Sequence, residues 1–192
     1  KLSVGMPFFL EVADRLAVLR PGINFLLPIA ATTSLEELIQ FSASGNSIAA
    51  NYHSSIRSVS PPKSDQSWRR IITTAGTEIY LEEQQPSHAS LSQCSLALTT
   101  IGANTSELGA LGVPMIVVVP TQHLNVMQAW DGLIGLFARI PGLRWCLGAL
   151  LSFWRLSRKG FMAWPNISAG RMVVPERVGQ ITPKEIAEEA VE

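Results

Sequence analysis

TTIGANTSELGALGVPMIVVVPTQ, residues 99–122, sets out a strand end, a glycine, a helix and a second strand in that order. An apolar run at 96–100 predicts the first strand, and Gly102 after it lets the backbone approach a ligand closely. Residues 103–111 predict a helix. The run MIVVV at 115–119 is rich in β-branched residues, which is typical of a strand buried on both faces.

The rest of the chain continues this alternation of helices and strands. A first helix stops at Pro21-Gly22, and Thr33 or Ser34 can cap a second one. The remaining expected elements are strands at 23–29, 71–74 and 78–81 and helices at 87–93 and from Lys184 onward. Together they predict an α/β fold, a Rossmann-like parallel sheet with helices on both faces. Ligands of such sheets bind beyond the carboxyl ends of the strands.

Bulk properties limit the function classes. The chain of 192 residues suffices for a single domain, taken as residues 1–192. Its formal net charge is zero, which argues against a nucleic-acid binder that works through bulk charge. The two cysteines fit no metal or redox spacing, so a reduced, cytoplasmic setting is expected. The sequence starts at Lys1 and ends within an expected helix, so we interpret it as part of a longer protein.

Two segments depart from the alternating pattern. Residues 42–67 are rich in Ser, Asn and Pro and predict an exposed, partly mobile loop. Residues 130–164 are apolar and tryptophan-rich, but their uncharged run at 145–154 is shorter than the roughly 20 apolar residues that span a bilayer. A buried core helix and a membrane-interface segment both fit this pattern. The basic excess between 139 and 177 favours contact with a membrane or with an acylated substrate.

The loop after the strand at 96–100 has the features of a ligand site. Free backbone N–H groups at a helix start bind phosphate well. The carboxylate of Glu107 can accept two hydrogen bonds from a vicinal diol such as a ribose, or it can close the helix start as a capping box. Gln122 follows the next strand and is expected beside this loop. The candidate ligand-contacting residues of this region are Gly102, Asn104, Thr105, Ser106, Glu107 and Gln122.

A second polar stretch, WPNISAGRMVVPE at 164–176, follows the apolar segment. It resembles the Pro-Asn-(apolar)-x-Ala-Gly-Arg signature, with its downstream glutamate, of the lipid-A-disaccharide synthase family. The stretch GALGVPMIVVVP is similar to that family in order and spacing. The resemblance covers the chain from about Ser95 to its end and is thin before residue 42. By position it implies that Asn166, Gly170 and Arg171 form a donor-pocket turn, because an amide and a guanidinium suit diphosphate oxygens.

The resemblance also implies a fold, a reaction and partners. The fold is the C-terminal, nucleotide-sugar-binding half of a two-domain GT-B glycosyltransferase. The reaction joins an acylated glucosamine from a UDP donor to an acylated, lipid-linked glucosamine phosphate, with inversion and without a metal or other cofactor. The general base is expected in the N-terminal half, so this chain alone binds donor at best. The protein is expected to bind peripherally to the cytoplasmic face of the inner membrane. Whether it forms a homodimer is left open.

The chain departs from the family in one loop. The family usually carries Ser-Gly-Thr where this sequence has IGANTS at 101–106, which leans toward other nucleotide-sugar transferases of the same fold. A divergent, synthase-related member is therefore expected. A UDP-sugar epimerase and a non-catalytic membrane-docking domain are the alternatives.

Overall fold

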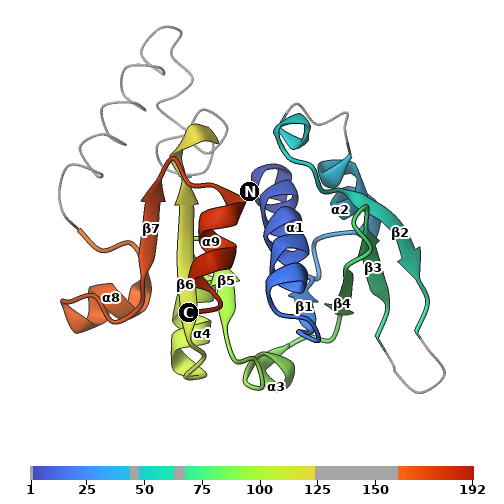
Figure 1. Ribbon diagram of the computed structural model, residues 1–192. Coiled ribbons are helices and arrows are strands. Elements are labelled where there is room, and N and C mark those ends of the chain that lie inside the picture. The colour runs from blue at the N-terminus through green and yellow to red at the C-terminus, as the bar shows by residue number, and fades with distance from the viewer. Residues whose placement is uncertain (1, 44–47, 63–67, 124–159) are drawn as a thin grey trace, which may run out of the picture.

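The computed structural model describes residues 2–43, 48–62, 68–123 and 160–192, and it shows a mixed α/β fold with two sheets (Figure 1). The described helices are α1 (Leu2–Leu19), α2 (Leu35–Ser42), α3 (His88–Leu91), α4 (Ala103–Ala110), α8 (Trp164–Ala169) and α9 (Pro183–Glu189), with 3₁₀ turns η1 (Ala49–Asn51) and η2 (Thr121–His123). The described strands are β1 (Phe25–Pro28), β2 (Ile56–Ser60), β3 (Arg70–Thr73), β4 (Glu78–Glu82), β5 (Ala97–Thr99), β6 (Met115–Pro120) and β7 (Glu176–Gly179).

The three-stranded sheet is parallel and has the order β5-β6-β7. Helix α4 connects β5 to β6, as the stretch at 99–122 predicts. All six residues of β6 are buried, because it is the central strand and both of its faces are covered. Its side chains alternate: Met115 and Val117 enter one core cluster, whereas Ile116 and Val118 enter another. The parallel α/β prediction is confirmed for this half of the chain.

The four-stranded sheet has the order β1-β4-β3-β2 and is mixed. Strands β1 and β4 are parallel, but β3 pairs antiparallel with both β4 and β2. The prediction of a parallel sheet is therefore wrong for the strand at 71–74, whereas the strand at 78–81 is parallel to β1 as predicted. Only four residues separate β3 from β4, with Gly76 at φ +95° in the turn, and a parallel pair needs a connection of about a dozen residues or more.

Part of the segment expected to be an exposed loop is a strand. Residues 56–60 form β2, which pairs with β3 and places Ile56 and Val59 against the core of the four-stranded sheet. The prediction of a loop over 42–67 is thus wrong for 56–60. Residues 44–47 and 63–67 lie outside the described ranges.

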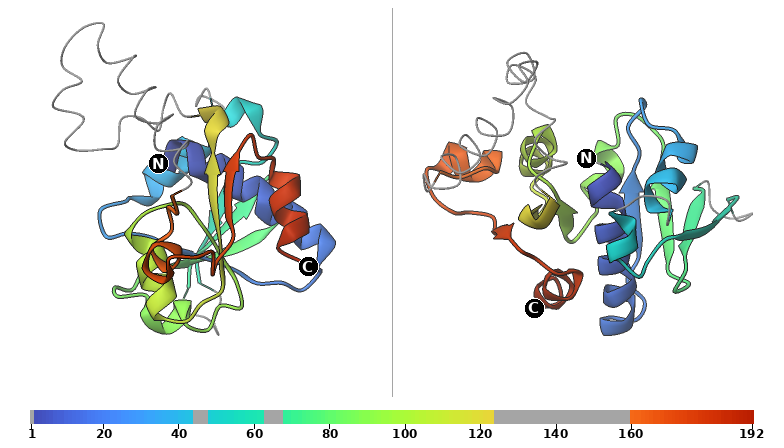
Figure 2. Two further views of the ribbon diagram at one scale, coloured as in Figure 1. Left: turned by 90° about the vertical axis from the view of Figure 1, so that its left-hand side faces the viewer. Right: turned by 90° about the horizontal axis from the view of Figure 1, so that it is seen from above.

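Helix α1 packs against both sheets. One side of it, with Met6, Leu10 and Ala13, contacts β1, β3 and β4. Its other side, with Phe8, Val12 and Leu16, contacts β6 and α9. Seen from above, α9 lies on one side of the three-stranded sheet, and α4 and α8 lie on the other (Figure 2). The three-stranded sheet is therefore covered on both faces.

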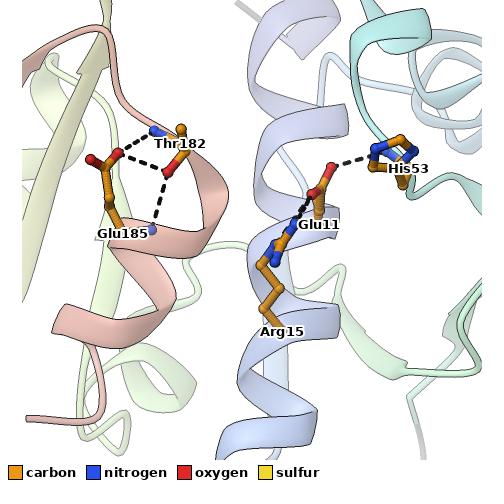
Figure 3. Close-up of polar contacts among 5 residues, drawn as sticks. All are labelled: Glu11, Arg15, His53, Thr182 and Glu185. Atoms are coloured by element: carbon orange, nitrogen blue, oxygen red, sulfur yellow. Dashed lines mark hydrogen bonds and ion pairs between the residues drawn. The ribbon is translucent and has the colours of Figure 1, made fainter.

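Side-chain hydrogen bonds tie α1 to a neighbouring segment and cap the start of α9 (Figure 3). The Glu11 carboxylate, which is buried on α1, accepts from the Arg15 guanidinium at 2.7 Å and from the His53 backbone N–H at 2.9 Å. It thereby ties the segment before β2 to α1. At the start of α9, Thr182 and Glu185 form a capping box. The backbone and hydroxyl donors of Thr182 hold the pKa of Glu185 below its usual range.

The expected helix cap at Ser34 is confirmed. Its hydroxyl accepts from the Glu37 backbone N–H at 3.1 Å, and the Glu37 carboxylate accepts from the Ser34 N–H at 2.9 Å. Most of the apolar segment at 130–164 lies outside the described residues, so its prediction is not tested. Within the described ranges, the structure contains no helix long and apolar enough to cross a membrane.

Candidate functional site

The candidate site begins where β5 ends and α4 starts. Gly102 is the N-cap of α4, and its φ of +149° and ψ of −170° belong to a region that residues with a side chain rarely adopt. No side chain caps this helix, so the capping box considered for Glu107 does not form. The helix start thus presents backbone N–H groups at the carboxyl edge of a parallel sheet, which is a favourable place for an anion.

Two side chains of this first turn point inward and shape the loop. The Asn104 amide donates to Thr99 Oγ1 and, at 3.1 Å, to the Thr100 carbonyl. Thr105 is fully buried, and its hydroxyl donates to the Gly102 carbonyl at 2.9 Å. The polar groups of Asn104 and Thr105 therefore hold the loop in place, whereas Ser106 is exposed.

Glu107 lies at the fifth position of α4 and contacts a histidine for which the sequence shows no partner. His88 Nε2 lies 2.8 Å from Glu107 Oε1, and the side chains are 53% and 41% exposed. Since His88 begins α3, this contact joins α3 to α4 at the surface. The carboxylate is open enough to accept a further donor on its solvent side.

Gln122 lies beyond the carboxyl end of β6, at the same sheet edge as Gly102. Its amide nitrogen donates to the Ile181 carbonyl at 2.7 Å, and its oxygen accepts from the Ile181 N–H at 3.3 Å. It therefore joins the end of β6 to the loop after β7. Gln122 also hydrogen-bonds Tyr52, which lowers the pKa of that phenol, but the larger effect of burial raises it.

The amide of Asn166 is occupied by the protein itself. The side chain is fully buried, and its oxygen accepts from the Val173 and Val174 N–H groups at 2.6 and 2.8 Å. Its nitrogen donates to the Val174 carbonyl at 2.8 Å and to Glu176 Oε1 at 2.6 Å. These four bonds use the whole hydrogen-bonding capacity of the amide. In this conformation Asn166 shapes the turn and leaves no group for a diphosphate, which differs from the role that the resemblance implies.

Glu176 completes this arrangement, although the sequence singled it out only as the last residue of the signature. Its carboxylate accepts from the Met162 and Ala163 N–H groups at 2.9 and 3.0 Å, in addition to the Asn166 amide. The carboxylate thereby fixes the start of α8 to the first residue of β7. We call Asn166 and Glu176, with the backbone groups that they bind, the clasp.

Gly170 and Arg171 form the outer end of the clasped turn. Gly170 ends α8 in the left-handed conformation, at φ +64°, as glycine after a helix commonly does. Arg171 is exposed and makes no hydrogen bond or ion pair with any residue in the described ranges. Exposed apolar side chains lie on α8 and the residues after it: Trp164, Ile167, Met172 and Val173.

The structure joins the two halves of the candidate site at one point. The Trp164 N–H donates to Thr105 Oγ1 at 3.1 Å, so the start of α8 lies against the first turn of α4. Arg171 is at the other end of α8, and a six-residue helix is about 9 Å long. It leads into the amino end of β7, whereas Gly102 and Gln122 follow the carboxyl ends of their strands. Gly102 and Gln122 thus share one end of the sheet, Glu107 lies further along α4 beside α3, and Gly170 with Arg171 forms a separate group.

Comparisons with known proteins do not assign the chain to a family. Neither protein-family models, nor curated proteins, nor solved structures gave a match to the chain. Within the described part of the chain, no group of three or more His, Cys, Asp or Glu residues is placed to hold a metal ion.

Proposed function

We propose that the chain is the nucleotide-sugar-binding domain of a GT-B glycosyltransferase of the lipid-A-disaccharide synthase type. The reaction passes an acylated glucosamine from UDP to a lipid-linked sugar phosphate. One observation carries the proposal: α4 starts at Gly102, without a side-chain cap, at the carboxyl edge of a parallel sheet. A diphosphate accepts hydrogen bonds from such amides, and stabilising its charge as it departs speeds glycosyl transfer.

The other residues have distinct roles in this proposal. Glu107 accepts from the ribose hydroxyls through the exposed side of its carboxylate. Arg171, whose guanidinium has no partner among the residues that the structure describes, supplies a forked donor to phosphate oxygens. Asn166, Thr105 and Asn104 hold the two loops in place and do not touch the donor.

UDP binding to the chain, measured by calorimetry, tests the role of the α4 start. Gly102→Ala forces a side chain into a strained backbone conformation and moves the first amides. Gly112→Ala is the matched control, because Gly112 has φ +69° at the opposite end of the same helix. We expect Gly102→Ala to weaken UDP binding at least about tenfold and Gly112→Ala to leave it unchanged. Equal affinities, or no UDP binding by the wild type, would remove the basis of the proposal.

The role of Arg171 needs its own comparison. Arg171→Ala is set against Arg57→Ala, which removes the same charge from an exposed position on β2. Loss of a charge-assisted bond to phosphate predicts an affinity for UDP about tenfold weaker for the first variant alone. Should both variants bind UDP as the wild type does, Arg171 has no part in donor binding.

The acylated acceptor implies contact with a membrane, which we propose for the exposed apolar side chains of α8. Trp164 and Ile167 are 51% and 46% exposed, as apolar side chains that enter a membrane interface must be. Co-sedimentation with phosphatidylglycerol vesicles tests this role. The double variant Trp164→Ser, Ile167→Ser is expected to lose binding. Val18→Ser, which changes a 79% exposed residue of α1, is expected to keep it. Identical sedimentation of both variants excludes this surface.

A further inference from the structure

A lysine or arginine three positions before a serine or threonine occurs twice in the sequence, at Arg57 with Ser60 and at Arg70 with Thr73. Thr73 is fully buried, so only the first of these two hydroxyls is open to another protein. Ser60 is also followed by proline, in the stretch RSVSPP at 57–62. Protein kinases select a serine by such charge patterns around it. Sequence and burial together thus single out Ser60 among the hydroxyls that share this spacing.

Ser60 is the last residue of β2, the outer strand of the four-stranded sheet (Figure 1). Within the described ranges β2 pairs only with β3. Ser60 is half-buried, whereas Arg57, Pro61 and Pro62 are exposed. Pro61 has no backbone N–H and cannot continue the ladder. Since the end of an edge strand opens locally at little cost, an enzyme can bind residues 57–62 in an extended conformation.

A buried arginine lies opposite Ser60 in the sheet. Ser60 pairs with Arg70 in the register of β2 and β3, so the two side chains lie on the same face. Residues in this relation have Cβ atoms about 4.5–5.5 Å apart, a span that an arginine and a phosphoserine side chain can bridge. Arg70 is 5% exposed, and its Nη1 donates to Glu78 of β4 at 2.7 Å. Since β3 lies between β2 and β4, Ser60 and Glu78 flank Arg70 from opposite strands.

The guanidinium of Arg70 has a donor that lacks an acceptor. Its Nε is buried and has no hydrogen-bond partner in the part of the chain that the structure describes. A buried donor without an acceptor weakens a fold, and more so when it belongs to a charged group. A phosphate group carries three acceptor oxygens and a charge of about −1.5 to −2 at neutral pH, which a guanidinium binds well. A phosphate on Ser60 would therefore satisfy this donor and tie β2 to β3.

We propose that Ser60 is a phosphorylation site and that its phosphate binds Arg70, which locks β2 onto the sheet. In the transfer, the Ser60 Oγ attacks the γ-phosphorus of ATP held by a protein kinase. The bond from Oγ to phosphorus forms, and the bond from that phosphorus to the β,γ-bridging oxygen breaks. ADP leaves, and the hydroxyl proton passes to a carboxylate of the kinase. Since β2 and β3 lie outside the candidate donor site, the modification does not depend on the glycosyltransferase proposal.

Phosphorylation of the folded chain by calmodulin-dependent protein kinase II and ATP tests the acceptor. This kinase selects an arginine three residues before the serine, and tandem mass spectrometry locates the phosphate. We expect phosphate on Ser60, and at least about tenfold slower labelling of Arg57→Ala, because a charge-assisted bond to the kinase is lost. Arg20→Ala, which removes an exposed arginine after α1, should be labelled as the wild type is. No phosphate on Ser60, or equal labelling of Arg57→Ala and wild type, overturns the proposal.

Ser60→phosphoserine, incorporated during synthesis, tests the contact with Arg70. The control Ser95→phosphoserine adds the same charge at an exposed position before β5 of the other sheet. We expect the first variant alone to lower the equilibrium constant for unfolding in urea, at least about tenfold, and Arg70→Gln to abolish this gain. A gain that persists in Arg70→Gln overturns the contact.

Phosphorus NMR titration of the two phosphoserine variants keeps the contact testable if Arg70→Gln does not fold. A guanidinium that binds the phosphate favours the dianion. It should therefore lower the second pKa of the phosphate, ordinarily about 6, at position 60 and not at position 95. Equal phosphate pKa values at the two positions would show that the phosphate does not bind Arg70.

Discussion

Replacing Asn166 with Ala tests whether the clasp holds the turn between α8 and β7. The wild-type amide is fully buried and makes four hydrogen bonds, two to backbone N–H groups, one to a carbonyl and one to Glu176. Alanine removes all four and leaves a small cavity. The Glu176 carboxylate loses one donor but keeps the Met162 and Ala163 N–H groups.

The expected loss can be worked out from these contacts. A typical internal hydrogen bond contributes about 1 kcal/mol net, and a buried group left without a partner costs about 1–3 kcal/mol. Val173 is 44% exposed, so water can replace the amide at its N–H. Val174 and Glu176 are less exposed, so water replaces the other three bonds less well. The free energy of unfolding should therefore fall by about 3–4 kcal/mol, a large part of the roughly 5–15 kcal/mol of a small domain.

Urea denaturation followed by circular dichroism measures this loss. With a slope of about 2 kcal/mol per molar urea, the midpoint of Asn166→Ala should fall by about 1.5–2 M. Ser168→Ala is the matched control, because Ser168 is exposed on the same helix, and its midpoint should hardly change. A difference of less than about 0.5 M between the two variants would refute the energetic role of the clasp.

A second substitution separates hydrogen bonding from the loss of volume. Asn166→Asp keeps the size of the side chain and the acceptor for the Val173 and Val174 N–H groups, but it places a carboxylate against Glu176. Repulsion and the lost donor should destabilise this variant at pH 8. Protonation of either carboxyl restores a donor, so the deficit relative to wild type should shrink at pH 5. A deficit that does not depend on pH contradicts this account.

Three further predictions concern other contacts. Thr105→Val should lower the free energy of unfolding by about 1–3 kcal/mol, because it removes the hydroxyl that bonds to Gly102 and Trp164. Thr105→Ser keeps these bonds and should lose less stability. Equal losses of the two variants in urea denaturation would show that the hydroxyl does not stabilise the fold. Burial raises the pKa of the Cys94 thiol, so less of it is thiolate at pH 8. In a Cys146→Ser variant, Cys94 should therefore react with Ellman's reagent more slowly at pH 8 than the thiol of an unstructured peptide. Equal reaction rates would contradict this prediction. The hydrogen bond from Arg69 lowers the pKa of Glu83, so the pair stabilises the fold above the ordinary glutamate range and the contribution is lost as the pH falls through the lowered pKa. Both side chains are more than a third exposed, so Arg69→Gln should cost less than about 1 kcal/mol at pH 7 and progressively less as the pH falls through the lowered pKa, as unfolding over a series of acidic pH values can show.

The β5–α4–β6 unit could be predicted from sequence because its signals are local and agree. Apolar strands, a glycine before the helix and β-branched residues in 115–119 all indicate one strand–helix–strand unit. The Ser34 cap could be predicted for the same reason, since a capping box involves only residues three apart. Where propensity, spacing and cap chemistry agree, the secondary structure of a segment depends little on its tertiary packing.

The antiparallel hairpin was missed although a local signal was present. The apolar composition of 71–74 and 78–81 favours a parallel sheet, but the short link through Gly76 rules out a crossover between these two strands. The length of the connection decides the pairing here, and not the residues within the strands. The pairing of His88 with Glu107 carried no comparable signal, because 19 positions separate the two residues and only the fold brings them together.

The clasp changes what the resemblance at 164–176 can establish. Three residues of the signature have a sufficient reason in the fold: Asn166 and Glu176 bind backbone groups, and Gly170 takes a left-handed conformation. A chain could therefore keep them only to build this turn, whether or not it transfers a sugar. Arg171 differs, because no contact within the described ranges accounts for it. Evidence for nucleotide-sugar chemistry must consequently come from Arg171 and from Gly102, whose backbone conformation residues with a side chain rarely adopt.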